Sequence, residues 1–177
     1  MGPTISWMNE DRDRRYVTPL SAPIHNEVAA FWARYVTASR ADPSVPLPPS
    51  WCFGDTVELA HELIELVVRG PKRATAGAVA EYDADGELLP SVGDLSIVTD
   101  GAMRPRALLA TTYVRVGPLS SVDEQFAWDE GEGDRTREWW LKAHTWYFSR
   151  SYARLGLEFH SDIPVVYERF AVLYYEG

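Results

Sequence analysis

Apolar residues recur at helical spacing near the start of the chain. Between residues 25 and 40 they lie three and four positions apart, which predicts a helix with one apolar stripe made of Val28, Ala29, Phe31, Trp32, Tyr35 and Val36. The stretch "ADPSVPLPPSWCFGD" ends this helix because its prolines cannot continue it. We interpret it as an extended connector whose Trp51 and Phe53 pack elsewhere in the protein.

A second helix is predicted to begin after Asp55 or Thr56, because either residue can cap it. Its apolar side consists of Leu59, Ala60, Leu63, Leu66 and Val67, and its acidic residues Glu58, Glu62 and Glu65 are expected to face water. Gly70 stands where a helix-ending glycine is typical.

The rest of the chain is mostly strand-like. "KRATAGAVAEY" is rich in small and β-leaning residues, "DADGELLPSVGD" carries turn chemistry, and "LSIVTD", "RALLATTYVRV" and "PVVYERFAVLYY" are typical of strands. Two helical patterns, "SVDEQFAWDE" and "TREWWLKAHTWYFSRSYARLG", lie before the last strand. This order differs from a regular alternation of strands and helices, so it favours an α+β domain built on a small mixed β-barrel with flanking helices.

Length indicates one domain, because 177 residues can bury a core of their own. We expect residues 1–22 to be a flexible N-terminal arm, since they mix charges and prolines without a period. Residues 23–50 then form an extra N-terminal helix with its proline-rich connector, and residues 51–177 form the main domain.

Charge and cysteine content narrow the classes of function. A net charge of −9 disfavours broad binding to nucleic acid, which generally needs a basic face. The single cysteine, Cys52, excludes an internal disulfide, and the four histidines show no zinc-ligand spacing. No apolar run approaches the length of a membrane span. We expect a cytoplasmic protein without metal, cofactor or membrane partner, and no pattern indicates an oligomeric state.

The segment "VVRGPKRATAG" places Lys72 and Thr75 three residues apart. A hydroxyl becomes a nucleophile when a neighbouring base takes its proton, and a desolvated lysine can be that base. In an extended chain the two side chains point to opposite faces, so they converge only if the chain bends after Gly70. The alternative is that Lys72 is a solvated residue following a helix.

The loop "FAWDEGEGDRT" crowds four carboxyl groups, those of Asp129, Glu130, Glu132 and Asp134. Crowded carboxylates raise one another's pKa, which suits a general acid, although a cation site or a solvated loop has the same composition. The histidines on predicted helices, His61 and His144, are interpreted as packing residues. Serine-hydrolase, Walker and dinucleotide motifs are absent from the sequence.

Four segments in this order resemble the ASCH domain family, whose members are PUA-like, and in particular its longer bacterial branch. They are "FGDTVELAHELIELVVRGPKRAT", "GELLPSVGDLSIVTDG", "FAWDEGEGDRTREWW" and "IPVVYERFAVLY", and the resemblance runs from about Trp51 to Tyr174. It implies a PUA-like barrel with a cleft at one end and a nucleoside or RNA ligand. A related short-chain bacterial member hydrolyses the amide of N4-acetylcytidine.

The resemblance also implies roles for individual residues. The motif Gly-x-Lys-x-x-Thr of that hydrolase matches Gly70, Lys72 and Thr75, and its glutamate matches Glu130, with Glu132 as the competing alignment. By similarity, Thr75 attacks the acyl carbonyl, Lys72 takes its proton and Glu130 protonates the leaving amine.

One residue departs from the family pattern. The pattern has an arginine two residues after the threonine, where this chain has Gly77, so Arg73 and Arg169 are the candidates to replace it as substrate-binding residues beside Glu132. The expected partner is a small nucleoside substrate or a short single-stranded RNA. The alternative functions are a noncatalytic RNA or nucleotide binding module and a metal-independent ribonuclease that uses the same cleft.

Overall fold

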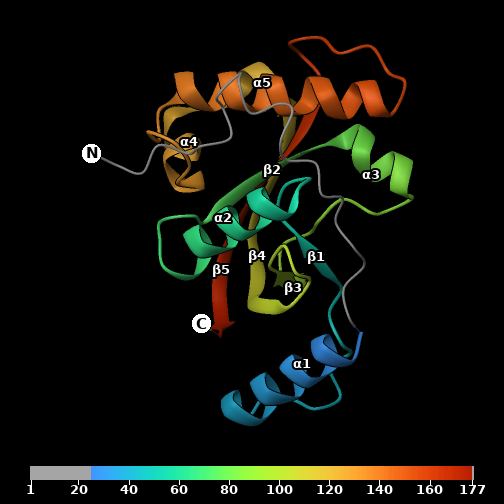
Figure 1. Cartoon of the computed structure of the whole chain (residues 1–177), viewed down its shortest axis with the longest axis vertical. Coiled ribbons are helices and arrows are strands. Elements are labelled where there is room, and N and C mark those ends of the chain that lie inside the picture. Colours follow the sequence, from blue (N-terminus) through green and yellow to red (C-terminus); the bar gives the residue numbers. More distant parts are fainter. Residues whose placement is uncertain (1–24, 177) are drawn as a thin grey trace. The chain divides into compact units, whose positions relative to one another are not determined.

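The computed structural model describes residues 25–176, and these residues form two compact units. Unit 1 contains residues 71–94 and 111–170, and unit 2 contains residues 25–70, 95–110 and 171–176. Figure 1 shows two long strands, β4 (Pro105–Pro118) and β5 (Pro164–Tyr175). Each of them contributes residues to both units. The predicted arm at residues 1–22 lies outside the described residues.

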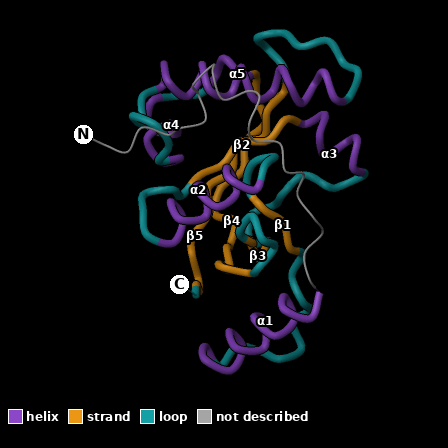
Figure 2. Tube along the Cα trace, viewed as in Figure 1, coloured by secondary structure: helices purple, strands orange, loops and turns teal. Residues whose placement is uncertain are grey.

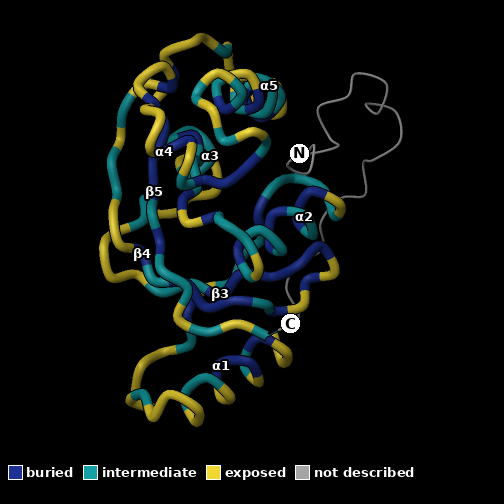
Figure 3. The backbone as a smooth tube through the Cα atoms, turned by 90° about the vertical axis from the view of Figure 1, so that its left-hand side faces the viewer, coloured by how far each residue is buried: buried dark blue, intermediate teal, exposed yellow. Residues whose placement is uncertain are grey.

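Unit 2 contains both predicted N-terminal helices, which confirms them. Helix α1 spans His25–Ser39 and α2 spans Val57–Val68, with the side chain of Thr56 accepting a hydrogen bond from the backbone nitrogen of Leu59. Figure 3 shows one side of α1 buried and the other exposed. The buried side contributes Val28, Phe31 and Trp32 to a cluster with Ile97 and Leu108.

The proline-rich connector of unit 2 ends in a short strand, β1 (Ser50–Cys52), that pairs in parallel with β3 (Leu95–Thr99). Phe53 is buried, and its ring meets that of Trp51 edge-on, so both aromatic residues pack as predicted. Strand β3 pairs with β4 in antiparallel register. The end of α2 differs from the prediction in one detail, because Gly70 does not adopt the left-handed conformation and Arg69 caps the helix.

Unit 1 places two helices, α4 (Glu124–Glu130) and α5 (Arg137–Arg154), against the antiparallel pair of β5 and β2 (Ala74–Ala78). The shared core contains aromatic residues from both helices and from β5, together with small residues from β2: Phe126, Trp140, Phe148, Tyr152, Tyr167, Ala74 and Ala78. A short 3-10 turn, Leu119–Ser121, follows β4.

Helix α3 (Val79–Asp85) occupies a stretch expected to hold strand and turn residues, so that expectation is wrong. The carboxylate of Glu81 accepts a hydrogen bond from the backbone nitrogen of Ala78, which satisfies the first turn of the helix. Gly86 ends α3 in the left-handed conformation, with a φ of 68°.

The strands, coloured orange in Figure 2, pair in the order β1-β3-β4-β5-β2, as their hydrogen bonds show. The first and last strands of this order are not paired with each other in the described residues, so the sheet is open and the expected barrel is not closed. The mixed α+β class is confirmed. Among residues 25–176, no helix is both long and apolar enough to cross a membrane.

Candidate functional site

Lys72 lies in the interior of unit 1, which rules out the alternative of a solvated lysine. Its side chain is 1% exposed, and its Nζ lies 2.5 Å from Oε1 of Glu132. The neighbouring backbone is fixed by a hydrogen bond from the nitrogen of Arg73 to the carbonyl of Asp129, 2.7 Å long. The segment that leaves α2 is therefore held directly against the end of α4.

The end of α4 turns its two glutamates inward. The side chain of Asp123 caps the start of the helix, and Gly131 ends it with a φ of 73°. A Cβ at Gly131 would lie 2.8 Å from the backbone nitrogen of Lys72, so only glycine allows this close approach. The sharp turn leaves Glu130 and Glu132 on either side of Gly131, and both are buried.

Glu130 contacts two side chains of α5. Nε1 of Trp140 donates a hydrogen bond to Oε2 of Glu130 at 2.5 Å, and Nε2 of His144 lies 3.3 Å from the same oxygen. The rings of Trp140 and His144 stack with centroids 3.8 Å apart. Both histidine nitrogens face acceptors, because Nδ1 lies 3.0 Å from the carbonyl oxygen of Trp140. This arrangement favours the doubly protonated imidazolium, which donates through both nitrogens.

Two acidic and two basic side chains balance one another in this part of unit 1. They are called the Lys72 cluster here and consist of Lys72, Glu130, Glu132 and His144. Burial raises the pKa of Glu132 above its ordinary value; the charge of Lys72 opposes this rise and that of Glu130 adds to it. Burial also acts to raise the pKa of Glu130, but the charges of His144 and Lys72 and the hydrogen bonds outweigh it, so this pKa is lowered. The two glutamates therefore differ in acid strength.

His144 makes the contribution of the Lys72 cluster to stability depend on pH. Burial acts to lower its pKa, but the charge of Glu130 and their hydrogen bond outweigh burial, so the pKa is raised above 6.5. A raised folded-state pKa contributes stability that is present below the unfolded-state value and is lost as pH rises through the folded-state value. We expect His144→Gln to lower the unfolding free energy on the acid side and the difference from the wild type to shrink at alkaline pH. Urea unfolding of both proteins from acidic to alkaline pH measures the difference in unfolding free energy. A difference that does not change with pH would contradict this prediction.

Thr75 lies on a different face of β2 from the core of unit 1. Ala74, Ala76 and Ala78 pack against that core, and because successive strand residues alternate, Thr75 points the opposite way. Within residues 25–176 its half-buried hydroxyl makes no hydrogen bond. The structure thus brings Lys72, Glu130 and Glu132 together and turns Thr75 away from them.

The two candidate substrate-binding arginines meet at Asp129. Nε of Arg169 lies 2.8 Å from the carboxylate of Asp129, whose backbone carbonyl accepts from Arg73. Arg169 also lies near the ring of Tyr113, 5.1 Å from its centroid. The guanidinium of Arg73 donates to the backbone carbonyl of Lys72. Both arginines therefore border the Lys72 cluster.

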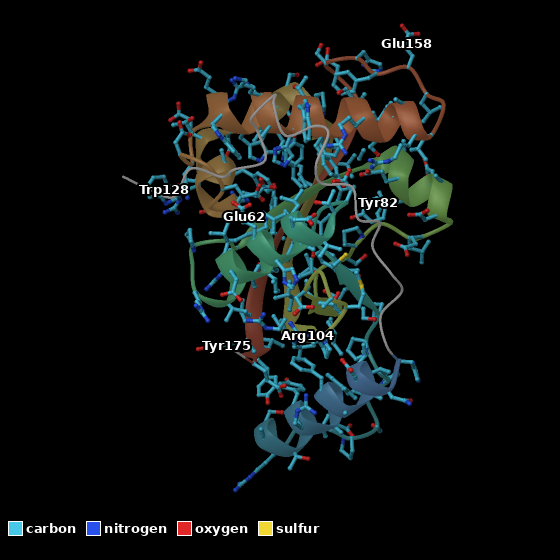
Figure 4. The ribbon with its side chains drawn as sticks, viewed as in Figure 1. Glu62, Tyr82, Arg104, Trp128, Glu158 and Tyr175 are labelled. Atoms are coloured by element: carbon cyan, nitrogen blue, oxygen red, sulfur yellow. The ribbon has the colours of Figure 1, made fainter. Side chains whose placement is uncertain are left out.

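An exposed aromatic residue lies near the same loop. Trp128, at the outer side of α4 (Figure 4), is 53% exposed. Cζ of Arg135 lies over its ring, 3.6 Å from the centroid. A planar surface of this kind can stack on a nucleobase. In the part of the chain that the structure describes, no three His, Cys, Asp or Glu side chains are grouped to hold a metal ion.

The sequence interpretation missed the contact of His144 with Glu130, because it took His144 for a packing residue. His144 follows Trp140 by four residues, and this spacing places both side chains on one side of α5, where both contact Glu130. The sequence could have indicated the contact through this spacing.

Comparisons with known proteins place these residues in a family context. The ASCH domain model matches residues 49–174. The crystal structure of protein EF3133 from Enterococcus faecalis V583 is 32% identical, with a TM-score of 0.77 over 85% of this chain and 90% of that one. The crystal structure of an ASCH domain from Lactobacillus crispatus JV V101 is also 32% identical, with a TM-score of 0.76 over 90% of this chain and 99% of that one. No curated protein matches the chain.

Proposed function

Because this chain belongs to the ASCH domain family, we propose that it hydrolyses the amide bond of an acylated nucleoside such as N4-acetylcytidine. The observation that carries the proposal is the buried contact between Lys72 and Glu132, residues sixty positions apart in the chain. A surface lysine in a chance motif match would not be desolvated against a carboxyl group from the second motif. The pKa of the buried Glu132 is raised, and buried groups with a shifted pKa are typical of functional sites.

In this proposal Thr75 is the nucleophile, and the Lys72–Glu132 pair holds the start of β2 that carries it. Glu132 is preferred to Glu130 as the partner of Lys72, because Glu130 is engaged by Trp140 and His144. Lys72 does not hydrogen-bond the hydroxyl of Thr75 in the described residues, so the base implied by the resemblance is not in contact with its nucleophile. In this proposal, the group that takes the proton of Thr75 therefore lies on the face of β2 to which Thr75 points.

Substituting Thr75 tests the proposed activity. We expect the wild type to release cytidine from N4-acetylcytidine, Thr75→Ala to lose this activity, and Thr75→Ser to keep part of it, because serine retains the hydroxyl. Liquid chromatography of the nucleosides measures the product, and Thr112→Ala, on an exposed residue of β4, is the control. Equal turnover by Thr75→Ala and the wild type would refute Thr75 as the nucleophile, and no turnover by the wild type would refute this substrate.

A second candidate, a noncatalytic module that binds RNA or nucleotides, is favoured by the exposed Trp128 with its stacked Arg135. We expect such a module to bind short single-stranded RNA at low salt and to lose affinity as salt rises. Fluorescence anisotropy with wild type and Trp128→Ala tests this. A gel of the same RNA after incubation without metal also tests the ribonuclease alternative.

A further inference from the structure

The face of β2 and β5 to which Thr75 points carries a second group of polar side chains, all in unit 1. Thr75 stands directly opposite Glu168 in the antiparallel register of these strands. Directly opposed residues on neighbouring strands point to the same face, with Cβ atoms about 4.5–5.5 Å apart. The carboxyl group of Glu168 is therefore within reach of the hydroxyl of Thr75 by rotation of their side chains.

Glu168 is a buried carboxyl group with one oxygen engaged. Glu168 is only 9% exposed. Its Oε1 accepts a hydrogen bond of 2.6 Å from the hydroxyl of Thr111. Its other oxygen, Oε2, accepts no hydrogen bond within residues 25–176. Burial raises the pKa of Glu168; the hydrogen bond from Thr111 opposes the rise and the charge of Asp94 adds to it. A carboxylate with a raised pKa is the stronger base.

Tyr82 brings a hydroxyl group to the same face. A Cβ at Gly77 would lie 3.0 Å from Cε2 of Tyr82 and 3.2 Å from its hydroxyl oxygen. Gly77 is two residues after Thr75, so both point to one face of β2. Tyr82 lies on α3 (Figure 4), and within the described residues its hydroxyl makes no hydrogen bond. Burial, and secondarily the charge of Glu168, raise its pKa, so the phenol remains a donor at neutral pH.

We propose that Thr75, Glu168 and Tyr82 form the acyl-transfer site, with Glu168 as the base and Tyr82 as the donor that stabilises the oxyanion. The assignment rests on the proposed amide hydrolysis and gives Thr75 the base that Lys72 does not supply. Gly77 leaves the space that the Tyr82 ring occupies, because a Cβ there would press against it.

The chemistry balances with water as the only co-reactant. As the oxygen of Thr75 bonds to the acyl carbon, its proton passes to Glu168 and the carbonyl electrons move to the oxygen facing Tyr82. The carbon–nitrogen bond then breaks, and the nitrogen leaves with the proton returned by Glu168. A water molecule, deprotonated by Glu168, attacks the ester of Thr75, and the acid is released as the proton returns to the threonine oxygen.

The test uses the full chain with p-nitrophenyl acetate, an activated ester that can acetylate Thr75 whether or not N4-acetylcytidine is a substrate. Intact mass and peptide mapping of samples quenched with acid during the reaction should show one acetyl group on Thr75. The acetylation rate should fall about 10²–10⁴-fold in Glu168→Gln and about 10²–10³-fold in Tyr82→Phe. Glu158→Gln, which neutralises an exposed glutamate in the segment between α5 and β5, should react at the wild-type rate.

A pH profile separates a base from a structural role and does not depend on the folding of the Glu168 variant. The wild-type rate should fall as pH drops through the pKa of Glu168, and Thr111→Val should move this acid limb to higher pH, because it removes the hydrogen bond that lowers that pKa. Wild-type rates in a folded Glu168→Gln, an acid limb unmoved by Thr111→Val, or no acetyl group on Thr75 would each overturn the assignment. Acetylation that depends on Glu168 without turnover of N4-acetylcytidine would instead refute only the proposed substrate.

Discussion

Replacing Lys72 with methionine is expected to lower the free energy of unfolding at neutral pH by about 3–5 kcal/mol, because removing one partner of a buried ion pair leaves the other without compensation. The side chains involved are 1% exposed for Lys72 and 7% exposed for Glu132, so water does not replace the lost contact. Methionine fills a similar volume, and the loss is therefore electrostatic rather than a cavity effect.

The pH dependence of the Lys72→Met effect follows from the carboxyl group left behind. Without Lys72, the pKa of Glu132 loses its main lowering influence and rises further above the unfolded-state value. A carboxyl group with a raised pKa destabilises the fold when it is ionised, so the deficit should shrink as pH falls and Glu132 takes up a proton. Urea unfolding at neutral and mildly acidic pH measures this.

Two controls identify the cause of the Lys72→Met effect. Lys142→Met changes an exposed lysine of α5 and should leave stability within about 0.5 kcal/mol of the wild type. The double variant Lys72→Met with Glu132→Gln removes both charges and should recover part of the loss. A single variant as stable as the wild type would show that the pair is not held together in solution.

Replacing Gly131 with alanine is the second large effect, with an expected loss of about 2–5 kcal/mol. About 1–2 kcal/mol comes from a left-handed φ of 73° that L-residues disfavour. A further 1–3 kcal/mol or so comes from the new Cβ, which would lie 2.8 Å from the backbone nitrogen of Lys72, where no flexible side chain can move aside.

Gly86→Ala is the matched control, because Gly86 has a similar φ of 68° but no atom within 4 Å of the added Cβ. It should therefore lose only the backbone contribution. Thermal unfolding of both variants gives the difference, which measures how tightly the end of α4 rests on Lys72. Equal losses would contradict the close approach.

The elements with a clear hydrophobic period were predictable from the sequence. The stretch "PVVYERFAVLYY" matches β5 residue for residue, and the apolar stripe after Thr56 matches α2. Helix α3 was missed because a seven-residue helix shows too few turns for a period, and its start depends on one contact from Glu81. The prediction of a closed barrel was wrong, because no pattern in the sequence indicates whether the first and last strands of the sheet pair with each other.

The candidate site was predictable only in part. The spacing of Lys72 and Thr75 and the acidic loop mark segments of interest, and the loop does supply the partner of the lysine. The sequence could not show that Thr75 faces Glu168, since that depends on the register of two strands far apart in the chain. Glu168 sits among apolar residues of β5, and a lone carboxyl group in such a run was the overlooked signal.

The pairing of β2 with β5 also has a consequence for the order in which the protein can fold during its synthesis. Ala74 pairs with Arg169, and Thr75 with Glu168, so Thr75 meets its opposing carboxyl group only after β5 has been synthesised. Contacts this distant in sequence form late and slowly. On the ribosome, a nascent chain therefore exposes Thr75 without its opposing carboxyl group until Glu168 has been synthesised, and fragments that end before β5 lack this pairing.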